Sequence, residues 1–182
     1  YWMLSAEIAQ KLADPKAVKG ERASEYLAIL TGRVQRIGER HLDSIRETAV
    51  EMTRRVRDGG RWFVRSPEHS GLASELVRVA SGPWMPNTGD WNAKKTRNIM
   101  LISGISPAYP EDVKLALEKQ IEGAYVIGIG PSAMDGEVPR GRLIDVVDSG
   151  FDNFSPESGG VLRFPGRKES FCPTSGIMSN VI

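Results

Sequence analysis

The chain has 182 residues, 40% of them hydrophobic, which suits a single globular domain with a sizeable core. Its 24 basic and 23 acidic residues give a net charge of +1, which argues against a dedicated surface for nucleic acid or for an acidic membrane. The single cysteine, Cys172, excludes an internal disulfide framework, and two histidines are too few for an ordinary zinc site. We therefore expect a cytoplasmic protein without a metal or a cofactor.

The chain begins with a short amphipathic piece and a charged linker, DPKAVKG, and residues 1–20 are interpreted as an N-terminal arm or linker. The longest regular pattern follows, from Glu21 to Asp58. Apolar residues recur there at steps of three and four, which predicts one long amphipathic helix that ends at the glycines after Asp58. His41 lies on the apolar face of this helix and is interpreted as a core or interface residue.

Short apolar runs after this helix predict the strands of a sheet. The strand candidates are Arg61–Arg65 (RWFVR), Asn98–Ile102 (NIMLI), Tyr125–Ile129 (YVIGI), Leu143–Val147 (LIDVV) and Gly160–Phe164 (GVLRF). Helices are expected after the first two strands, at about 71–81 and 110–122. This alternation predicts a three-layer α/β/α sandwich with a mainly parallel sheet of about five strands.

Hydroxyl side chains follow two of these strands, at the edge where parallel sheets bind ligands. The hydroxyl residues are Ser66 and Ser70 after the first strand, Ser103 and Ser106 after the second, and Thr174 and Ser175 before the last apolar segment. Hydroxyls and backbone amides at helix N-termini suit a phosphate or another small anion. Serine and threonine are also the preferred helix caps, which is the alternative role for each hydroxyl, but three such places on one sheet edge favour a pocket.

Two common phosphate-binding signatures are missing. The chain has no G-x-x-x-x-G-K-[ST] loop, which argues against a P-loop nucleotide site. It also has no G-x-G-x-x-G after the first strand, which argues against a dinucleotide.

The order of these motifs resembles the SIS (sugar isomerase) domain. GGRWFV, the His-Ser turn and LASELVRVASG resemble its opening, and LISGISPAYPEDVKLALEKQIEGAYVIGIGP resembles its second strand–helix–strand segment. DNFSPESGGVLRFPGRKESFCPTSGIMSNVI is similar to the tail of uncharacterised phosphoheptose-isomerase-like members. The resemblance covers roughly residues 21–182. It implies a sugar-phosphate-binding domain that forms a homodimer, or a higher homo-oligomer, through the long helix.

The resemblance also implies a reaction. The six hydroxyl residues would hold the phosphate, and an enzyme of this kind would interconvert an aldose phosphate and a ketose phosphate. Glu68 as base and His69 as acid, with His69 also contacting the ligand, are the candidates for moving the proton between adjacent carbons. The glycines usual at this turn are replaced here by Arg65, Pro67 and Glu68. A non-catalytic sensor that binds a sugar phosphate to control a partner therefore stays open as the alternative.

Overall fold

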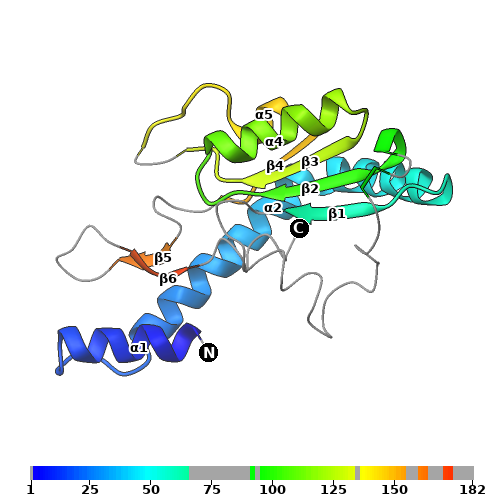
Figure 1. The fold of residues 1–182 in the computed structure, drawn as a ribbon. Coiled ribbons are helices and arrows are strands. Elements are labelled where there is room, and N and C mark those ends of the chain that lie inside the picture. The colour runs from blue at the N-terminus through cyan, green and yellow to red at the C-terminus, as the bar shows by residue number, and fades with distance from the viewer. Residues whose placement is uncertain are drawn as a thin grey trace.

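The computed structural model describes residues 2–65, 91–92, 95–133, 136–154, 160–163 and 170–173. Its elements, in chain order, are α1 (Trp2–Ala13), α2 (Glu21–Arg57), β1 (Trp62–Arg65), the 3-10 turn η1 (Lys95–Arg97), β2 (Ile99–Ser103), α4 (Pro110–Ile121), β3 (Tyr125–Gly130), α5 (Leu143–Val146), β4 (Ser149–Asp152), β5 (Gly160–Arg163) and β6 (Ser170–Pro173). Figure 1 shows their arrangement. The predicted long helix is confirmed as α2. No helix in these ranges is long and apolar enough to cross a bilayer.

The four strands of the main sheet lie in the order β1-β2-β3-β4 and are all parallel (Figure 1). One row of paired residues runs across them, from Arg65 to Ile102, Gly128 and Gly150. All four strands therefore end on the same side, the carboxyl edge. The expected parallel sheet is confirmed, with four strands in the described part of the chain instead of about five.

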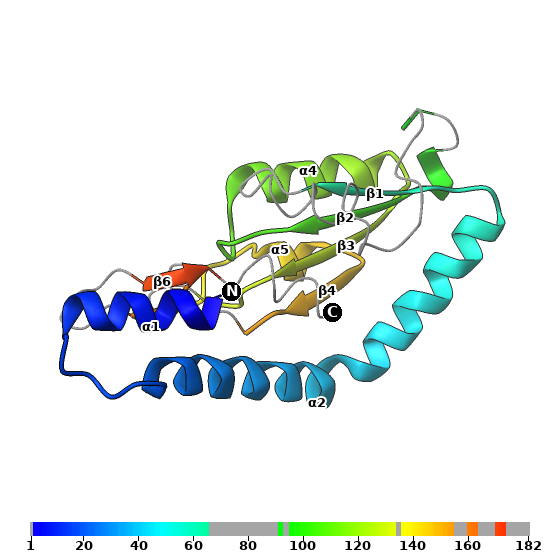
Figure 2. The same ribbon diagram turned by 90° about the horizontal axis from the view of Figure 1, so that it is seen from below.

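Helices pack on both faces of this sheet (Figures 1 and 2). On one face, Ile45, Met52 and Val56 of α2 pack against a buried cluster that includes Trp62 and Ile99. The other face is covered by α4 and α5 and by Trp91, packed on a second cluster. Burial on both faces explains why the strands read as continuous apolar runs. Each fully buried large side chain stabilises the fold by about 1.5–3 kcal/mol.

The strand predicted at Leu143–Val147 is wrong. Leu143–Val146 form the short helix α5, and the fourth strand is β4, directly after it. The amide of Leu143 donates to the carbonyl of Pro107 at 2.8 Å, and its side chain is fully buried. β4 contains Ser, Gly and Asp, which are rare in strands, so its conformation depends on tertiary contacts. A Cβ on Gly150 would lie 1.8 Å from the carbonyl oxygen of Ile144, so only glycine fits there.

The strand predicted at Gly160–Phe164 exists as β5, but it does not join the main sheet. It pairs antiparallel with β6 in a separate two-stranded ribbon, in which Leu162 faces Phe171. β5 lies against α2, and β6 lies against α1. The ribbon therefore packs on the helical part of the molecule.

The N-terminal arm is fixed to α2 by one carboxylate. Glu7 of α1 accepts hydrogen bonds from the amides of Gly20 (2.9 Å) and Ala23 (2.7 Å). These are amides that the first turn of a helix leaves unpaired, so Glu7 takes the place of the missing N-cap side chain. The amides of Ala23 and Gly20, in this order of strength, lower the pKa of Glu7.

Candidate ligand site at the carboxyl edge

Of the hydroxyl and acid–base residues predicted to form a site, the structure describes Ser103 and Ser106. The other six, Ser66, Glu68, His69, Ser70, Thr174 and Ser175, lie outside the described residues. Arg65, the last residue of β1, pairs with Ile102, which precedes Ser103. The strands that precede the two predicted turns, β1 and β2, therefore end at the same edge of the sheet.

The turn that follows β2 is held firmly in place. Ser103 is buried, and the amide of Gly104 donates to the carbonyl of Ile129 on β3 at 2.9 Å. The carbonyl of Pro107 accepts the amide of Leu143, which ties the other end of the turn to α5. A binding turn fixed in this way loses little conformational entropy when a ligand binds.

A buried carboxylate, Asp112 in the first turn of α4, lies against this turn. A Cβ on Gly104 would come within 2.8 Å of Asp112 Oδ2, so the glycine lets the turn pack on the carboxylate. Asp112 is fully buried and cannot touch a ligand directly. Ligand contacts at this place therefore come from the hydroxyls and backbone amides of the turn.

A second buried polar residue, Asn153, follows β4. Its side chain is fully buried, and its backbone amide donates to the carbonyl of Gly130 at the end of β3 (3.0 Å). The next residue, Phe154, has the left-handed φ of 51°, which is uncommon for a bulky side chain. Its amide donates to Asp152 Oδ1 at 2.8 Å, which supports this conformation. Ser103, Asp112 and Asn153 thus bring buried polar side chains to one edge of an otherwise apolar sheet.

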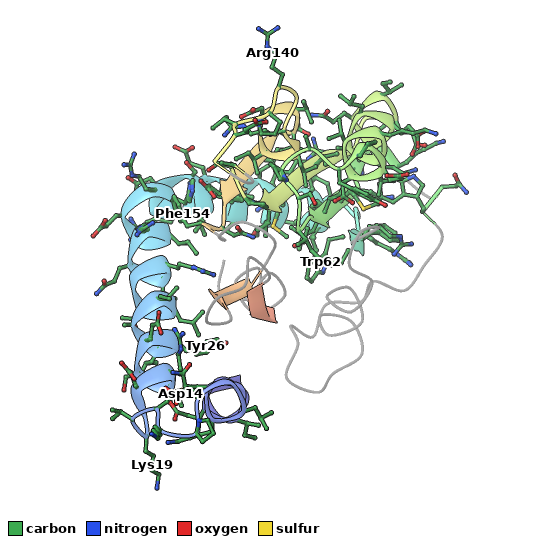
Figure 3. All side chains as sticks on the ribbon, turned by 90° about the vertical axis from the view of Figure 1, so that its left-hand side faces the viewer. Asp14, Lys19, Tyr26, Trp62, Arg140 and Phe154 are labelled. Carbon is green, nitrogen blue, oxygen red and sulfur yellow. The ribbon has the colours of Figure 1, made fainter. Side chains whose placement is uncertain are left out.

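His41 of α2 packs against Phe151 of β4 and against Phe154, which Figure 3 labels. Its ring stacks on Phe154 with a centroid distance of 5.7 Å and meets the edge of Phe151 at the same distance. Its Nε2 is buried and has no hydrogen-bond partner among the described residues. These contacts agree with the interpretation of His41 as a core or interface residue.

Two arginines, one before α5 and one in α2, differ in their surroundings. Arg142, which precedes α5, donates to Ser132 O (3.1 Å) and, through Nε and Nη2, to Asp145 at 2.7 Å. The Asp145 carboxylate raises the pKa of Arg142. Arg33 of α2 is buried, and this burial lowers its pKa to about 10. Both side chains therefore stay charged at neutral pH.

Sequence reasoning missed three of these residues for identifiable reasons. Asp112 lies in the first turn of a helix, where acidic residues are common because they interact favourably with the helix dipole. Only the structure reveals that Asp112 is buried. Asn153 follows a strand that the apolar pattern does not predict. Arg33 lies within a helix whose arginines are mostly exposed, so its type and position carry no signal of burial.

No protein-family model matches the chain, and a search of curated proteins finds no match. Among the described residues, no group of three or more His, Cys, Asp or Glu side chains is placed to hold a metal ion. The function is therefore argued from the sheet edge and its residues.

Proposed function

We propose that the chain binds a sugar phosphate at the carboxyl edge of its sheet. The observation that carries this proposal is the gathering of Ser103, Asp112 and Asn153, all buried, at that edge. Burying polar groups costs free energy, so they are rare in cores without a structural or functional reason. The carboxyl edge is also where open parallel sheets bind ligands.

The β2 turn would supply part of the phosphate site. Ser103 and Ser106 offer hydroxyls, and the turn is fixed by its bonds to β3 and α5. A phosphate has several acceptor oxygens, so the proposal includes further hydroxyl donors after β1, Ser66 and Ser70.

The proposed reaction is aldose–ketose isomerisation. A base removes the proton from the hydroxyl-bearing carbon next to the carbonyl while an acid protonates the carbonyl oxygen, which gives an enediol. The protonated base then delivers a proton to the former carbonyl carbon, and the deprotonated acid takes the proton from the other enediol hydroxyl, so both groups return to their starting states. Glu68 is proposed as the base and His69 as the acid, because both follow β1 directly and can be tuned to neutral pH. This assignment rests on the resemblance to sugar isomerase domains.

Binding is tested by thermal shift and calorimetry with a panel of aldose and ketose phosphates. Unphosphorylated sugars and inorganic phosphate serve as ligand controls. A ligand in excess of its dissociation constant raises the unfolding midpoint, and only the sugar phosphates are expected to do so clearly. If no member of the panel shifts the midpoint, the proposal is rejected.

Catalysis is tested separately from binding. The chain is incubated in D₂O with each sugar phosphate that binds, and NMR follows both conversion and deuterium uptake at the carbon next to the carbonyl. Glu68→Gln is expected to keep binding and to lose turnover. Binding without turnover in the unchanged protein favours the alternative, a non-catalytic sensor.

A further inference from the structure

Arg142 lies at the carboxyl edge of the sheet, beside the turn that is proposed to bind phosphate. The next residue, Leu143, is fully buried, and its amide donates to the carbonyl of Pro107 at the end of the β2 turn (2.8 Å). Nη1 of Arg142 donates to the carbonyl of Ser132, two residues beyond β3 (3.1 Å). The backbone at Arg142 is therefore held against the β2 turn, and its guanidinium reaches the chain just beyond β3.

The guanidinium of Arg142 is oriented by Asp145, three residues further along the chain. Nε and Nη2 of Arg142 donate to the two carboxylate oxygens of Asp145, both at 2.7 Å, which fixes the plane of the guanidinium. With the bond to Ser132, three of its five N–H groups are used within the part of the chain that the structure describes. The side chain is 22% exposed, which leaves the remaining two N–H groups for a ligand. Arg142 is thus a donor that is already in place before a ligand binds.

The position of this guanidinium suits the sugar part of the proposed ligand better than its phosphate. β2 pairs with β3, and β3 pairs with β4. Neighbouring strands lie about 4.8 Å apart, so a group beside the ends of β3 and β4 lies roughly 5–10 Å from a phosphate bound by Ser103 and Ser106. An extended pentose or hexose chain spans such a gap. The oxygens that reach Arg142 are therefore those remote from the phosphate.

The charges around Arg142 also favour a neutral group. Asp145, through its hydrogen bonds, and Asp152 more weakly raise the pKa of Arg142, so both carboxylates lie near the guanidinium. One cation beside two carboxylates gives little attraction for a second phosphate. Hydroxyl and carbonyl oxygens accept hydrogen bonds from an arginine without adding charge. This arrangement therefore fits a sugar monophosphate better than a bisphosphate.

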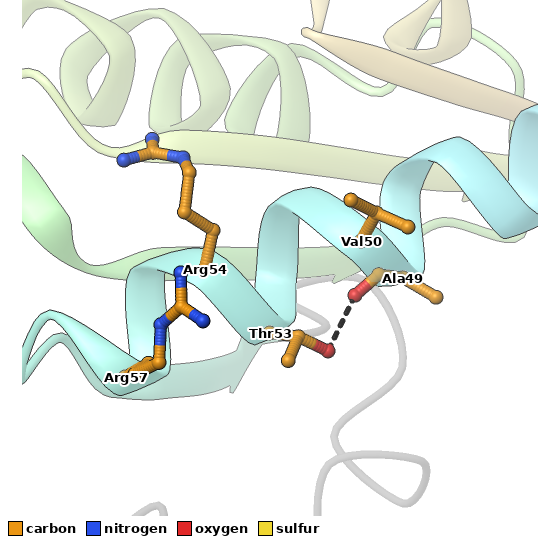
Figure 4. A pocket seen from close by; sticks show the side chains of 5 residues that line it. All are labelled: Ala49, Val50, Thr53, Arg54 and Arg57. Carbon is orange, nitrogen blue, oxygen red and sulfur yellow. Dashed lines mark hydrogen bonds between the residues drawn. The ribbon is translucent and has the colours of Figure 1, made fainter.

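A second arginine with the same kind of pairing lies in different surroundings. Arg54 of α2 donates through Nε and Nη2 to Glu51, at 2.8 and 2.7 Å, beside a depression of about 420 Å³ (Figure 4). The described residues that line this depression are Ala49, Val50, Thr53, Arg54 and Arg57. Among them only Thr53 has a hydroxyl, and it donates to the carbonyl of Ala49 at 2.7 Å within the helix. Arg142, in contrast, lies beside a turn that carries two serines.

We propose that Arg142 binds the sugar oxygens remote from the phosphate and so determines which sugar phosphates the site accepts. This inference rests on the proposed function. The two remaining N–H groups of Arg142 donate to a hydroxyl or carbonyl oxygen of the bound sugar, while Asp145 holds the guanidinium in place. Pentose, hexose and heptose phosphates gain this contact, and triose phosphates are too short to reach it.

Calorimetry with monophosphates of trioses, pentoses, hexoses and heptoses tests the inference. Arg142→Gln is expected to weaken the binding of the longer sugar phosphates about tenfold and to leave triose phosphate binding unchanged. Arg142→Lys is expected to show the same selective loss, because lysine keeps the charge but lacks the planar fork. If R142Q does not fold, as judged by urea denaturation, R142K gives the same comparison.

Arg140→Gln is the matched control for this experiment. Arg140 is exposed in the same loop, and its side chain points away from the sheet and the helices (Figure 3), so its loss is expected to leave every affinity unchanged. An equal loss for short and long sugar phosphates, or no loss for any of them, overturns the role of Arg142 and leaves the proposed function standing. If the unchanged chain binds no sugar phosphate, the proposed function fails and this inference fails with it.

Discussion

The two edges of the parallel sheet are built from polar residues in different ways. At the amino edge, Asn98, Arg55 and Trp91 connect helices, loops and strands through hydrogen bonds within the fold. At the carboxyl edge, Ser103, Asp112 and Asn153 are buried beside the turns where the ligand site is proposed.

The centre of the amino edge is Asn98, which is fully buried. Its Oδ1 accepts the amide of Arg61 at 3.0 Å, and its Nδ2 donates to Trp91 O at 2.8 Å. Its carbonyl accepts the amide of Tyr125, also at 3.0 Å. The side chain of Asn98 therefore fixes the start of β1 and the loop before β2, and its backbone carbonyl fixes the start of β3.

Two further contacts complete this edge. The guanidinium of Arg55 donates to Thr96 O (3.2 Å) and stacks over the Tyr125 ring at 5.2 Å. Trp91 donates to Glu122, lies 4.7 Å from the Lys119 ammonium and packs edge-on against Phe63. Trp91 and Lys119, in this order, lower the pKa of Glu122.

If the carboxyl edge binds the ligand as proposed, buried polar groups serve structure at one edge of the sheet and binding at the other. Substitutions at the amino edge are expected to lower the free energy of unfolding without changing ligand affinity. Substitutions of the short residues at the carboxyl edge are expected to change affinity more than stability. The following four changes test this division.

The largest effect is expected from Gly60→Ala at the amino edge. A Cβ there would lie 2.2 Å from Arg97 O and 2.9 Å from Arg55 O, so the backbone must move. We expect a loss of about 3 kcal/mol or more in urea denaturation. Gly32→Ala in α2, where a Cβ meets nothing, is the control and should stabilise by about 0.5–1 kcal/mol. A mild G60A phenotype contradicts the close packing.

The second-largest loss of unfolding free energy is expected from Asn98→Ala. It leaves the amide of Arg61 and the carbonyl of Trp91 without their partner, at a cost of about 2–3 kcal/mol. Urea denaturation measures the loss, and calorimetry checks that affinity for any bound sugar phosphate stays unchanged. A fall in affinity with little loss of stability would break the distinction between the edges.

Ser103→Ala is expected to do the reverse of Asn98→Ala, lowering ligand affinity more than stability. We expect the affinity for a sugar phosphate to fall about tenfold, or about 1.4 kcal/mol, while stability changes by less than about 1 kcal/mol. The matched control is Ser149→Ala, because Ser149 Oγ bonds Thr48 (2.8 Å) and Tyr125 (2.6 Å) within the fold. S149A should lower stability and leave affinity unchanged. Equal affinities for both variants would remove Ser103 from the site.

The smallest effect is pH-dependent and concerns Glu51 near the amino edge. Hydrogen bonds from Arg54 and then Arg55 lower the pKa of Glu51 from 4.5 to about 2. Because the folded-state pKa is lowered, the charged form stabilises the fold at neutral pH. This contribution is lost as the pH falls from about 4.5 to about 2.

Glu51→Gln should therefore be less stable than the unchanged chain at pH 7, by about 1 kcal/mol because solvent screens the partly exposed pairs. The difference in unfolding free energy between E51Q and the unchanged chain, measured by urea denaturation, should disappear as the pH falls from about 4.5 to about 2. Glu118→Gln is the control, since its contact with Lys114 is long (3.9 Å) and exposed. A difference between E51Q and the unchanged chain that does not vary with pH would exclude this ion pair as its cause.

Part of the candidate site could be predicted from the sequence. Ser103 and Ser106 follow an apolar run directly, and the ends of parallel strands share one edge, so their position followed from pattern alone. Asp112 and Asn153 could not be found in this way. Burial of a polar side chain depends on which elements pack over it, and no local pattern encodes that.

The sequence by itself determined the long helix and strands β1, β2 and β3, because their apolar periodicity and continuous apolar runs are local and strong. Only the tertiary structure decided that residues 143–146 form a helix and Ser149–Asp152 a strand. The amide of Leu143 is held by a hydrogen bond to the carbonyl of Pro107, far away in the sequence. Gly150 is required because the backbone of Ile144 packs directly against it. Where local preference is weak, such packing contacts outweigh it, and they exist only once the chain has folded.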